Sequence, residues 1–526
     1  MKTNPPLQQF MDACNDAGLG LPLVDSTTLL PASVLVTSPS QWRKLAETAK
    51  SINMRWCSFW CRETDNGLEA FSCYEGNGAY LIMRSLINTD EVLPSLAPVY
   101  PAADRPERHA HDLLGIMFDD QPDNRRWIRH QAWEEMHHPL RSEFQSAGSS
   151  ETTPADYLYP FAPAHGPGVM EIPVGPVHAG IIEPGHFRFQ AVGEIVLNIE
   201  ERLGYTHKGI EKIAIGRDAH ELARLAGRIS GDTTIAHTWA ACQAMERAAG
   251  LNIPFRALWL RAVMAERERI ANHLGDIGAI CNDVGFVFAQ SQLTRLKEIW
   301  VRENRKIFGH RLLMDCIIPG GTAVDISPES TCELLESSKL LAAEVDVIVK
   351  LLEDSESLED RLMGTGRLTP EKAIELGAVG YVGRASGQSF DVRRDAAYTP
   401  YDHLQISVPC FRAGDVAARA KIRAEEVRIS AKIINDLLET LPDGSHLAIW
   451  KNPQHVCEGM GFIEGWRGEI MTYIRFGNDG RVTRFFPRDP SWLNWPALEL
   501  LMQDNIVPDF PVCNKSVNGS YSGHDL

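Results

Sequence analysis

The segment from Pro254 to Val284 most constrains the fold, because the helix it would form carries apolar residues on more than one side. A helix with that pattern lies inside a bundle rather than at its surface. Two further segments carry apolar residues at helical spacing and are expected to pack beside it. The first follows the capping-type SPEST and contains Leu334, Leu341, Val345, Ile348 and Leu352, and the second contains Ile422, Ile429, Ile433 and Leu437.

The rest of the chain predicts a second domain and two hairpins. Residues 1–141 mix an apolar run at Val34 to Val36, a helix-like QWRKLAETAK and strand-like FSCYEG and AYLIMRSLI. Residues 142–173 are rich in Ser, Thr, Gly, Pro and Ala, a composition typical of a linker. Turns at Gly193-Glu194 and at Asn478-Asp479-Gly480 predict hairpins. We therefore expect an α+β domain over 1–141, and over 174–526 a mainly α-helical domain with β-hairpins.

Charge and cysteine usage exclude several classes of function. Lys plus Arg number 52 against 69 Asp plus Glu, a net charge of −17 that disfavours nucleic acid as a partner. No apolar run reaches about 18 residues, and the start of the chain lacks a secretory pattern, so neither a membrane span nor a signal peptide is expected. Eleven cysteines without a CxxC pair indicate free thiols of a cytoplasmic protein.

Clustered charge marks the end of the first domain, in ERHAHDLLGIMF, DNRRWIRH and HHPLR. Two interpretations stay open here: a solvated turn at an interface, or a docking surface for another protein. A metal site is disfavoured, because the histidines show no ordered ligand spacing; they are His109, His111, His137 and His138.

These three strings resemble the signature of the smaller of two neighbouring peripheral-arm subunits of respiratory complex I. Further along, GPVHAGIIEPGHFRFQAVGEIVLNIEERLGYTHKGIEKIA resembles the opening of the quinone-site subunit of complex I. It is equally similar to the large subunits of membrane-bound nickel–iron hydrogenases. The two are fused here, as in formate-hydrogenlyase-type large subunits. The resemblance implies a nickel–iron hydrogenase large-subunit fold for the second domain.

The same resemblance locates the residues that hold nickel and iron in hydrogenases, which are four cysteines in two CxxC pairs. Ser230 and Thr233 stand at the first pair, before His237, which matches a family histidine, and Ser520 and Gly523 stand at the second pair. Hydroxyls and a glycine cannot replace bridging thiolates. We therefore expect no bound metal and no hydrogen evolution by this chain.

For a quinone site, the resemblance points to loop histidines and a carboxylate. His178 and His186 match the histidines of the family loop, and Asp283 matches the aspartate paired with that loop. Ala219 occupies the position of the family tyrosine, and the adjacent His220 is a candidate substitute donor. Taken alone, each histidine is equally an ordinary loop residue.

Further site residues are also implied by the resemblance. Arg228 matches an arginine near the cluster of a neighbouring subunit, and Arg467 lies in the turn FIEGWRGEI, where Trp466 replaces a proline. Structural ion pairs remain the alternative for both arginines. ERERIANHL offers Glu266, Glu268 and His273 as a proton relay or, alternatively, as a satisfied helix network.

The function that the resemblance implies is that of a core cytoplasmic subunit of a membrane-bound, complex I-related oxidoreductase. It would couple electron transfer at a neighbouring iron–sulfur cluster, with quinone as a candidate acceptor, to ion translocation. Expected partners are a small iron–sulfur subunit, a ferredoxin-like subunit and antiporter-like membrane subunits on the inner face of the plasma membrane. The chain lacks a nucleotide motif, so NADH would bind elsewhere. The alternative is a non-redox scaffold or coupling subunit of an antiporter-like transport complex.

Overall fold

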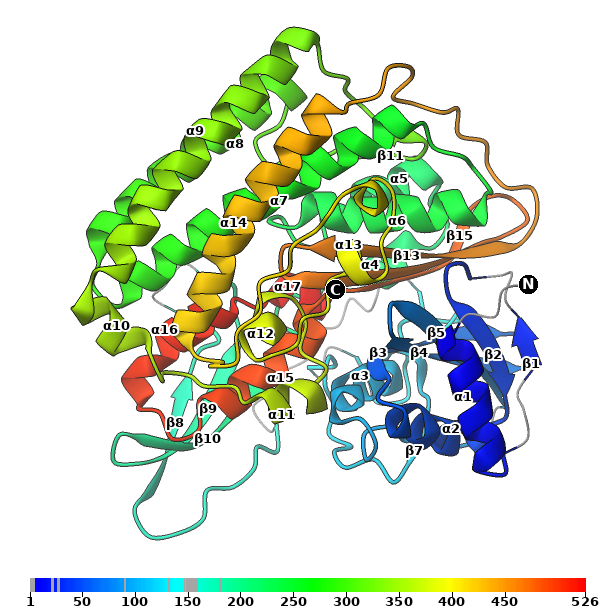
Figure 1. Cartoon of the computed structure of the whole chain (residues 1–526). Coiled ribbons are helices and arrows are strands. Elements are labelled where there is room, and N and C mark those ends of the chain that lie inside the picture. Colours follow the sequence, from blue (N-terminus) through cyan, green and yellow to red (C-terminus); the bar gives the residue numbers. More distant parts are fainter. Residues whose placement is uncertain are drawn as a thin grey trace.

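The computed structural model describes residues 5–19, 23–25, 29–88, 91–130, 133–145, 147, 159–178 and 182–526. In it the predicted central helix is α7 (Phe255–Asp283), whose side chains are buried along most of its length. α7 packs against α14 (Val416–Glu439) and α8 (Val287–Phe308), and α9 (Pro328–Glu353) packs on α8 and α14. These four long helices form the bundle in the upper part of Figure 1.

The first part of the chain forms a five-stranded sheet with strand order β1-β2-β5-β4-β3, in which only β2 and β5 pair in parallel. The predicted helix QWRKLAETAK lies within α2. The elements are α1 (Pro5–Asp16), β1 (Leu23–Asp25), β2 (Ser33–Thr37), α2 (Pro39–Ser51), β3 (Arg55–Thr64), β4 (Gly67–Gly76), β5 (Ala79–Ile87), β6 (Leu93–Pro94), η1 (Pro101–Ala103), α3 (Asp104–Leu114) and β7 (Phe118–Asp119).

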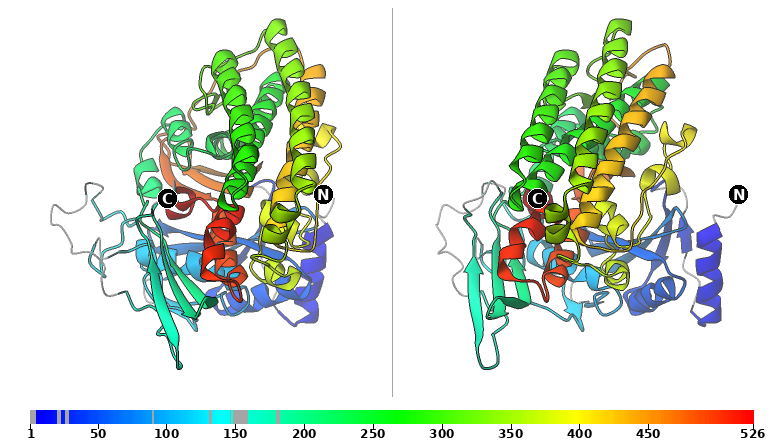
Figure 2. Two further views of the ribbon diagram at one scale, coloured as in Figure 1. Left: turned by 90° about the vertical axis from the view of Figure 1, so that its left-hand side faces the viewer. Right: turned by 60° about the vertical axis from the view of Figure 1, so that its left-hand side comes forward.

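Both predicted hairpins are confirmed. β9 (His186–Val192) and β10 (Ile195–Arg202) pair across Gly193-Glu194, and β8 (Val169–Val174) adds to β9. This three-stranded sheet stands at the edge of the molecule in both views of Figure 2. The second hairpin joins β14 (Gly468–Phe476) to β15 (Val482–Arg488), and β13 (Cys457–Gly465) completes that sheet.

The first sheet packs directly on the β13–β15 sheet. Trp60 of β3 stacks on Phe486 with ring centroids 5.7 Å apart. Arg55 and the Tyr80 hydroxyl both donate to the buried carboxylate of Glu469, Tyr80 at 2.6 Å. The two parts of the chain thus share one buried interior, which their separation by a linker-like sequence does not suggest. The domain boundary at residue 141 stays a prediction.

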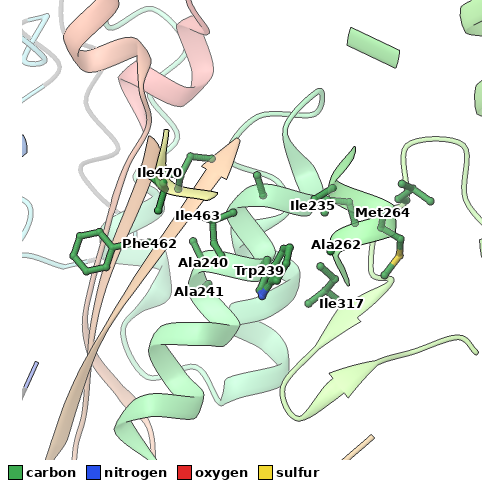
Figure 3. Close-up of a cluster of buried hydrophobic side chains, with 14 of the residues drawn as sticks. Ile235, Trp239, Ala240, Ala241, Ala262, Met264, Ile317, Phe462, Ile463 and Ile470 are labelled. Carbon is green, nitrogen blue, oxygen red and sulfur yellow. The ribbon is translucent and has the colours of Figure 1, made fainter. Parts of the chain in front are cut away.

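Buried α6 (Thr234–Ala248) lies against β13, where Trp239 and Ala240 meet Ile463 (Figure 3). Gly461 permits this approach, because a Cβ there would lie 2.0 Å from the Ala240 carbonyl oxygen. The remaining elements are α4 (Ile210–Ala214), α5 (Ala219–Ala226), β11 (Ile317–Ile318), β12 (Gly321–Thr322), α10 (Glu356–Leu362), α11 (Pro370–Glu375), α12 (Gly380–Ala385), α13 (Val392–Asp395), η2 (Tyr401–His403), α15 (Ser491–Leu501), η3 (Val507–Asp509), α16 (Phe510–Val517) and α17 (Tyr521–Asp525).

The charged run ERHAHD forms most of α3 and is buried except for the half-buried His111, so for this string the interpretation as a solvated turn is wrong. Its charges have partners inside the chain. Nε2 of His109 lies 2.9 Å from Glu211, and Asp112 accepts the backbone N–H groups of Trp127 and Arg129. Buried charges persist when they are paired in this way. Over the described ranges, no helix is both long and apolar enough to cross a bilayer.

Candidate functional site

Four segments far apart in sequence converge where the resemblance places the metal of hydrogenases. They are the loop between α5 and α6, the tip of the β13–β14 hairpin, the residue Asp489 after β15, and the C-terminal stretch around α17. Tight pairing of Gly465 with Gly468 leaves only Trp466 and Arg467 in the hairpin turn, which directs Arg467 into this region.

Hydroxyl groups occupy the expected ligand positions and bond to one another. The Oγ atoms of Ser230 and Ser520 are 2.9 Å apart. Ser230 and Thr233 both donate to Oδ1 of Asp232, at 2.7 and 2.9 Å. Ser520 Oγ accepts the backbone N–H of Gly523 at 2.9 Å and caps α17. The structure therefore brings the four positions together.

Arg467 closes this hydroxyl cluster with a bidentate ion pair. Its Nη1 and Nη2 donate to the two carboxylate oxygens of Asp232 at 2.8 and 2.7 Å, and Nε donates to the Asn518 carbonyl at 2.7 Å. Burial would raise the pKa of Asp232, but the charge of Arg467 and the donated hydrogen bonds hold that pKa well below its usual range. Sequence reasoning missed Asp232, although it is the carboxylate between the two ligand positions.

A second buried pair, His237 with Asp489, flanks the cluster. Nε2 of His237 donates to Oδ2 of Asp489 at 2.8 Å, and both side chains are fully buried. Burial opposes ionisation of Asp489, but the hydrogen bond and charge of His237 lower its pKa. Asp489 fills the space beyond Gly523, because a Cβ at Gly523 would lie 2.7 Å from Asp489 Oδ2.

A nickel–iron group does not fit these residues. The hydroxyls are committed to Asp232 and to each other, the guanidinium of Arg467 lies against them, and Gly523 has no room for a thiolate side chain. Throughout the part of the chain that the structure describes, no group of three or more His, Cys, Asp or Glu side chains is arranged to hold a metal ion.

His178 lies in the connection between β8 and β9, and His186 is the first residue of β9. His178 Nε2 donates to the Gly185 carbonyl at 2.8 Å, and His186 Nδ1 donates to the Gly175 carbonyl at 3.1 Å. These bonds leave Nε2 of His186 buried and without a partner among the described residues. Burial lowers the pKa of His186, and the charge of Arg188 adds to this effect. His186 is therefore a neutral imidazole near pH 7.

Tyr521 is a residue of this region to which the family motifs did not point. Its ring packs against Gly185, where a Cβ would lie 2.4 Å from it, and stacks edge-on against Trp495. Asn514 donates to its hydroxyl at 3.4 Å. Beside it, the backbone N–H of Ser522 donates to Glu183 in the histidine loop at 3.1 Å. The C-terminal segment therefore links the hydroxyl cluster to the histidine loop.

The structure gives Asp283 a partner other than the loop. Its Oδ1 accepts from Lys515 of α16 at 2.5 Å, while Oδ2 is buried without a partner within the described ranges. No described contact joins Asp283 to His178 or His186. The pairing with the loop, which the resemblance implies, stays a prediction.

The two remaining candidates lie at the surface. His220 is exposed near the start of α5, whose N-terminus is capped by Asp218 and Glu221. Arg228 is half-exposed and forms an ion pair with Asp315, so the structural alternative accounts for its position as well.

The proposed relay in ERERIANHL divides into two environments. Burial would raise the pKa of Glu266, but the charges of Arg393 and Arg269 hold it at about 2. Hydrogen bonds donated by Ser430 and Tyr401 act in the same direction. Glu268 instead accepts the N–H groups of Ile235 and Ala236 at the start of α6, and burial raises its pKa to about 8.

Ion pairs extend from Glu266 through the interior to His273. The path leads through Arg393, Asp391 and Arg384, and Arg384 pairs with both Glu464 and Glu426. Nε2 of His273 lies 2.7 Å from Glu426. Burial and the nearby charge of Asp391 raise the pKa of Glu464 to about 7. Arg467 is not part of this network. Glu469 also lies outside this network and forms ion pairs with Arg55 and Arg488.

Comparison with known proteins identifies the family of the chain. Residues 35–150 match the family described as "Respiratory-chain NADH dehydrogenase, 30 Kd subunit", residues 208–275 match "Nickel-dependent hydrogenase", and residues 283–460 match "Respiratory-chain NADH dehydrogenase, 49 Kd subunit". Formate hydrogenlyase subunit 5 of Escherichia coli is 30% identical over 459 residues, which cover 86% of this chain and 80% of that protein. The chain belongs to the family that contains complex I peripheral-arm subunits and formate-hydrogenlyase-type large subunits.

Other members include an NADH-quinone oxidoreductase subunit of Phocaeicola vulgatus, 28% identical over 74% of this chain and 78% of that protein. Among solved structures, a chain of the archaeal membrane-bound sulfane sulfur reductase superposes with a TM-score of 0.64 over 68% of this chain and 99% of that one, at 23% identity. This last likeness shows a shared fold. The resemblance inferred from the motifs is thereby confirmed.

Proposed function

We propose that the chain is the core peripheral subunit of a membrane-bound, complex I-related oxidoreductase, as its similarity to formate hydrogenlyase and NADH-quinone oxidoreductase subunits suggests. It couples electron transfer at an iron–sulfur cluster in a neighbouring subunit to ion translocation, with quinone as the electron acceptor. Small iron–sulfur, ferredoxin-like and antiporter-like membrane subunits are its partners, and it sits on the cytoplasmic face of the membrane.

The observation that carries this proposal is the replacement of the metal cage by a closed hydroxyl and ion-pair cluster. Hydrogen activation in the family needs soft thiolate ligands, which Ser230, Thr233, Ser520 and Gly523 do not supply. The Asp232–Arg467 pair then stabilises these loops without a metal. Without a metal, the family reaction that this chain can still support is quinone reduction at the loop that carries His178 and His186.

That loop offers groups suited to a quinone carbonyl. Reduction of a quinone by two electrons takes up two protons, so the site needs donors that are replenished at neutral pH. Burial favours the neutral form of His186, and its Nε2 has no partner among the described residues. The ring of Tyr521, which carries a hydroxyl, packs against the neighbouring Gly185. In this proposal Tyr521 takes the role of the family tyrosine that Ala219 cannot perform, and the exposed His220 is not needed.

A histidine variant in the intact complex tests this function. The complex is purified through this chain, and nickel, iron and quinone are measured per chain. We expect bound quinone, iron in the partner subunits and no nickel. His186→Gln should lower quinone-dependent turnover by at least about a hundredfold and leave assembly unchanged. His455→Gln, an exposed histidine on the connection before β13, is the matched control. Nickel near one per chain, or full activity of His186→Gln, would refute the proposal.

A non-redox scaffold of a transport complex is the second candidate. One observation favours it: Asp283 forms an ion pair with Lys515, and no described contact joins it to the loop with His178 and His186. In that case the complex contains neither iron nor quinone, and ion or solute transport survives His186→Gln.

A further inference from the structure

A large cavity lies in the helical bundle, apart from the hydroxyl cluster and from the histidine loop. Its volume is about 740 Å³, and it lies between α7, α9, α10, α14 and the connection that precedes α14. Figure 1 shows these elements meeting at the lower end of the bundle. A volume of roughly 300–1,000 Å³ between the helices of a bundle is typical of sites for small molecules.

Alanines on α14 create this space. Ala417, Ala418, Ala420 and Ala424 all face the cavity, and an alanine side chain ends at Cβ, so α14 cannot fill the gap to α10. The opposite walls are aliphatic, with Ile277 and Ile280 from α7 and Leu352 from α9. Cys281 adds a thiol whose pKa burial raises to about 12, and it therefore behaves as a small apolar group.

The acidic groups of α14 that reach the cavity are already used. Asp415 caps α14 by accepting the N–H of Ala418 at 2.8 Å, and it also accepts the N–H of Gly364 at 2.9 Å. Glu425 accepts from Arg428 at 2.5 Å. Neither carboxylate is therefore free to bind a cationic ligand.

Two cations at the mouth have no such commitment. The ammonium of Lys421 lies 5.5 Å from the centroid of the Phe411 ring, and Arg412, which follows Phe411 in sequence, also lines the cavity. Within the described residues, neither Lys421 nor Arg412 forms an ion pair. Two exposed carboxylates, Glu353 and Glu359, belong to the other wall, formed by α9 and α10. Lys421 and Arg412 are the cations among the residues that line the cavity, and they lie on α14 and on the connection before it, while the cavity behind them is apolar.

We propose that this cavity binds a single-chain anionic amphiphile, such as a long-chain fatty acid, with its tail between α7, α10 and α14 and its carboxylate at Lys421 and Arg412. The apolar wall provides affinity in proportion to the length of the tail. The two cations orient the ligand, because they are the positively charged hydrogen-bond donors among the residues that line the cavity. This site is independent of the quinone proposal.

Binding to the purified full-length chain tests the proposal, with saturated fatty acids of increasing length, below their micelle concentration, as probes. Affinity measured by calorimetry should rise by about fourfold per added methylene until the cavity is filled. Ala420→Leu, at a half-buried position, should narrow the cavity and weaken binding several-fold. Thermal melts of that variant report whether it folds.

Charge variants keep the test decisive if Ala420→Leu does not fold. Lys421→Glu should weaken binding several-fold, whereas Lys432→Glu, an exposed lysine on the same helix outside the cavity, should not. The methyl ester of the same fatty acid should bind more weakly than the acid. Absence of saturable binding, or equal binding by the folded Ala420→Leu variant, would overturn the site. Equal affinity for the acid, its ester and a neutral quinone would overturn the anionic specificity.

Discussion

Arg467 forms a two-pronged ion pair with Asp232 across 235 residues of sequence, at 2.8 and 2.7 Å. The pair ties the β13–β14 hairpin to the loop that precedes α6. Through its Nε, the same guanidinium also holds the Asn518 carbonyl of the C-terminal segment. One side chain therefore connects the hairpin to the two segments that carry the ligand positions matched to those of hydrogenases.

Replacement of Arg467 by lysine should destabilise the protein. A lysine keeps the charge but not the planar fork, so one carboxylate oxygen of Asp232 and the Asn518 carbonyl lose their donors. Because Asp232 is partly exposed, we expect a moderate loss of about 1–2 kcal/mol in the free energy of unfolding. Denaturant titration measures it. Arg302→Lys, in an exposed pair with Glu298, should change stability by less than about 0.5 kcal/mol, and an equal loss there would contradict the assigned role.

A side chain at Gly523 should be destabilising for a steric reason. A Cβ would lie 2.7 Å from the carboxylate of Asp489, which His237 holds in place. Overpacking of this kind costs about 1–3 kcal/mol, so Gly523→Ala should lower the thermal midpoint measurably. Gly231→Ala is the matched control, because nothing lies within 4 Å of its Cβ. Introducing cysteine at all four ligand positions should therefore yield an unstable protein without nickel, and metal analysis of that variant would detect the contrary.

Much of the fold could be predicted from periodicity and turn signals. The buried helix α7, the long helices α9 and α14 and both hairpins follow from local patterns that the structure retains. The burial of α3 could not be predicted, because the charges of ERHAHD look solvated until their partners, such as Glu211, come from distant parts of the chain. Local composition does not predict ion pairs between residues that are far apart in sequence.

The candidate site was predictable in its positions but not in its contacts. Family motifs located Ser230 and Ser520, and the structure places their hydroxyls side by side. The same motifs could not reveal Asp489, Lys515 or Tyr521, because each acts on a segment hundreds of residues away. Tyr521 contacts Gly185 through its ring, a relation without any signal in sequence spacing.

Glu268 should make stability depend on pH between about 4 and about 8. Burial raises its pKa to about 8, and the charge of Asp232 also raises it, while the N–H groups of Ile235 and Ala236 and the charge of Arg269 act in the opposite direction. Because the folded state binds a proton that the unfolded state releases near pH 4.3, stability is lost as pH rises through this window.

Glu268→Gln should remove that contribution. Between about pH 5 and about pH 8, the free energy of unfolding should decrease with pH less steeply in the Glu268→Gln variant than in the unaltered protein. The difference between the two slopes should be up to about 1.4 kcal/mol per pH unit. Comparison of the variant with the unaltered protein separates the contribution of Glu268 from those of Glu107 and Glu464, whose pKa values are also raised. Glu298→Gln on the surface of α8 serves as the control. Parallel pH profiles for Glu268→Gln and the unaltered protein would show that Glu268 is ionised when folded.

Tyr521 should matter for quinone chemistry more than for stability. Its hydroxyl receives one long hydrogen bond from Asn514, so Tyr521→Phe should cost less than about 1 kcal/mol. If this hydroxyl supplies a proton at the histidine loop, quinone-dependent turnover of the intact complex should fall at least about tenfold, and its pH profile should change. Tyr74→Phe removes a buried hydroxyl without a partner among the described residues, in the first sheet, and should leave turnover unchanged.

The combination of Tyr521→Phe with His186→Gln separates a shared role from two separate ones. If both groups serve the same proton transfer, the double variant should be no slower than the slower single variant. Multiplicative losses would indicate independent contributions. Unchanged turnover and an unchanged pH profile in Tyr521→Phe would show that the ring of Tyr521, packed on Gly185 and Trp495, only supports the loop.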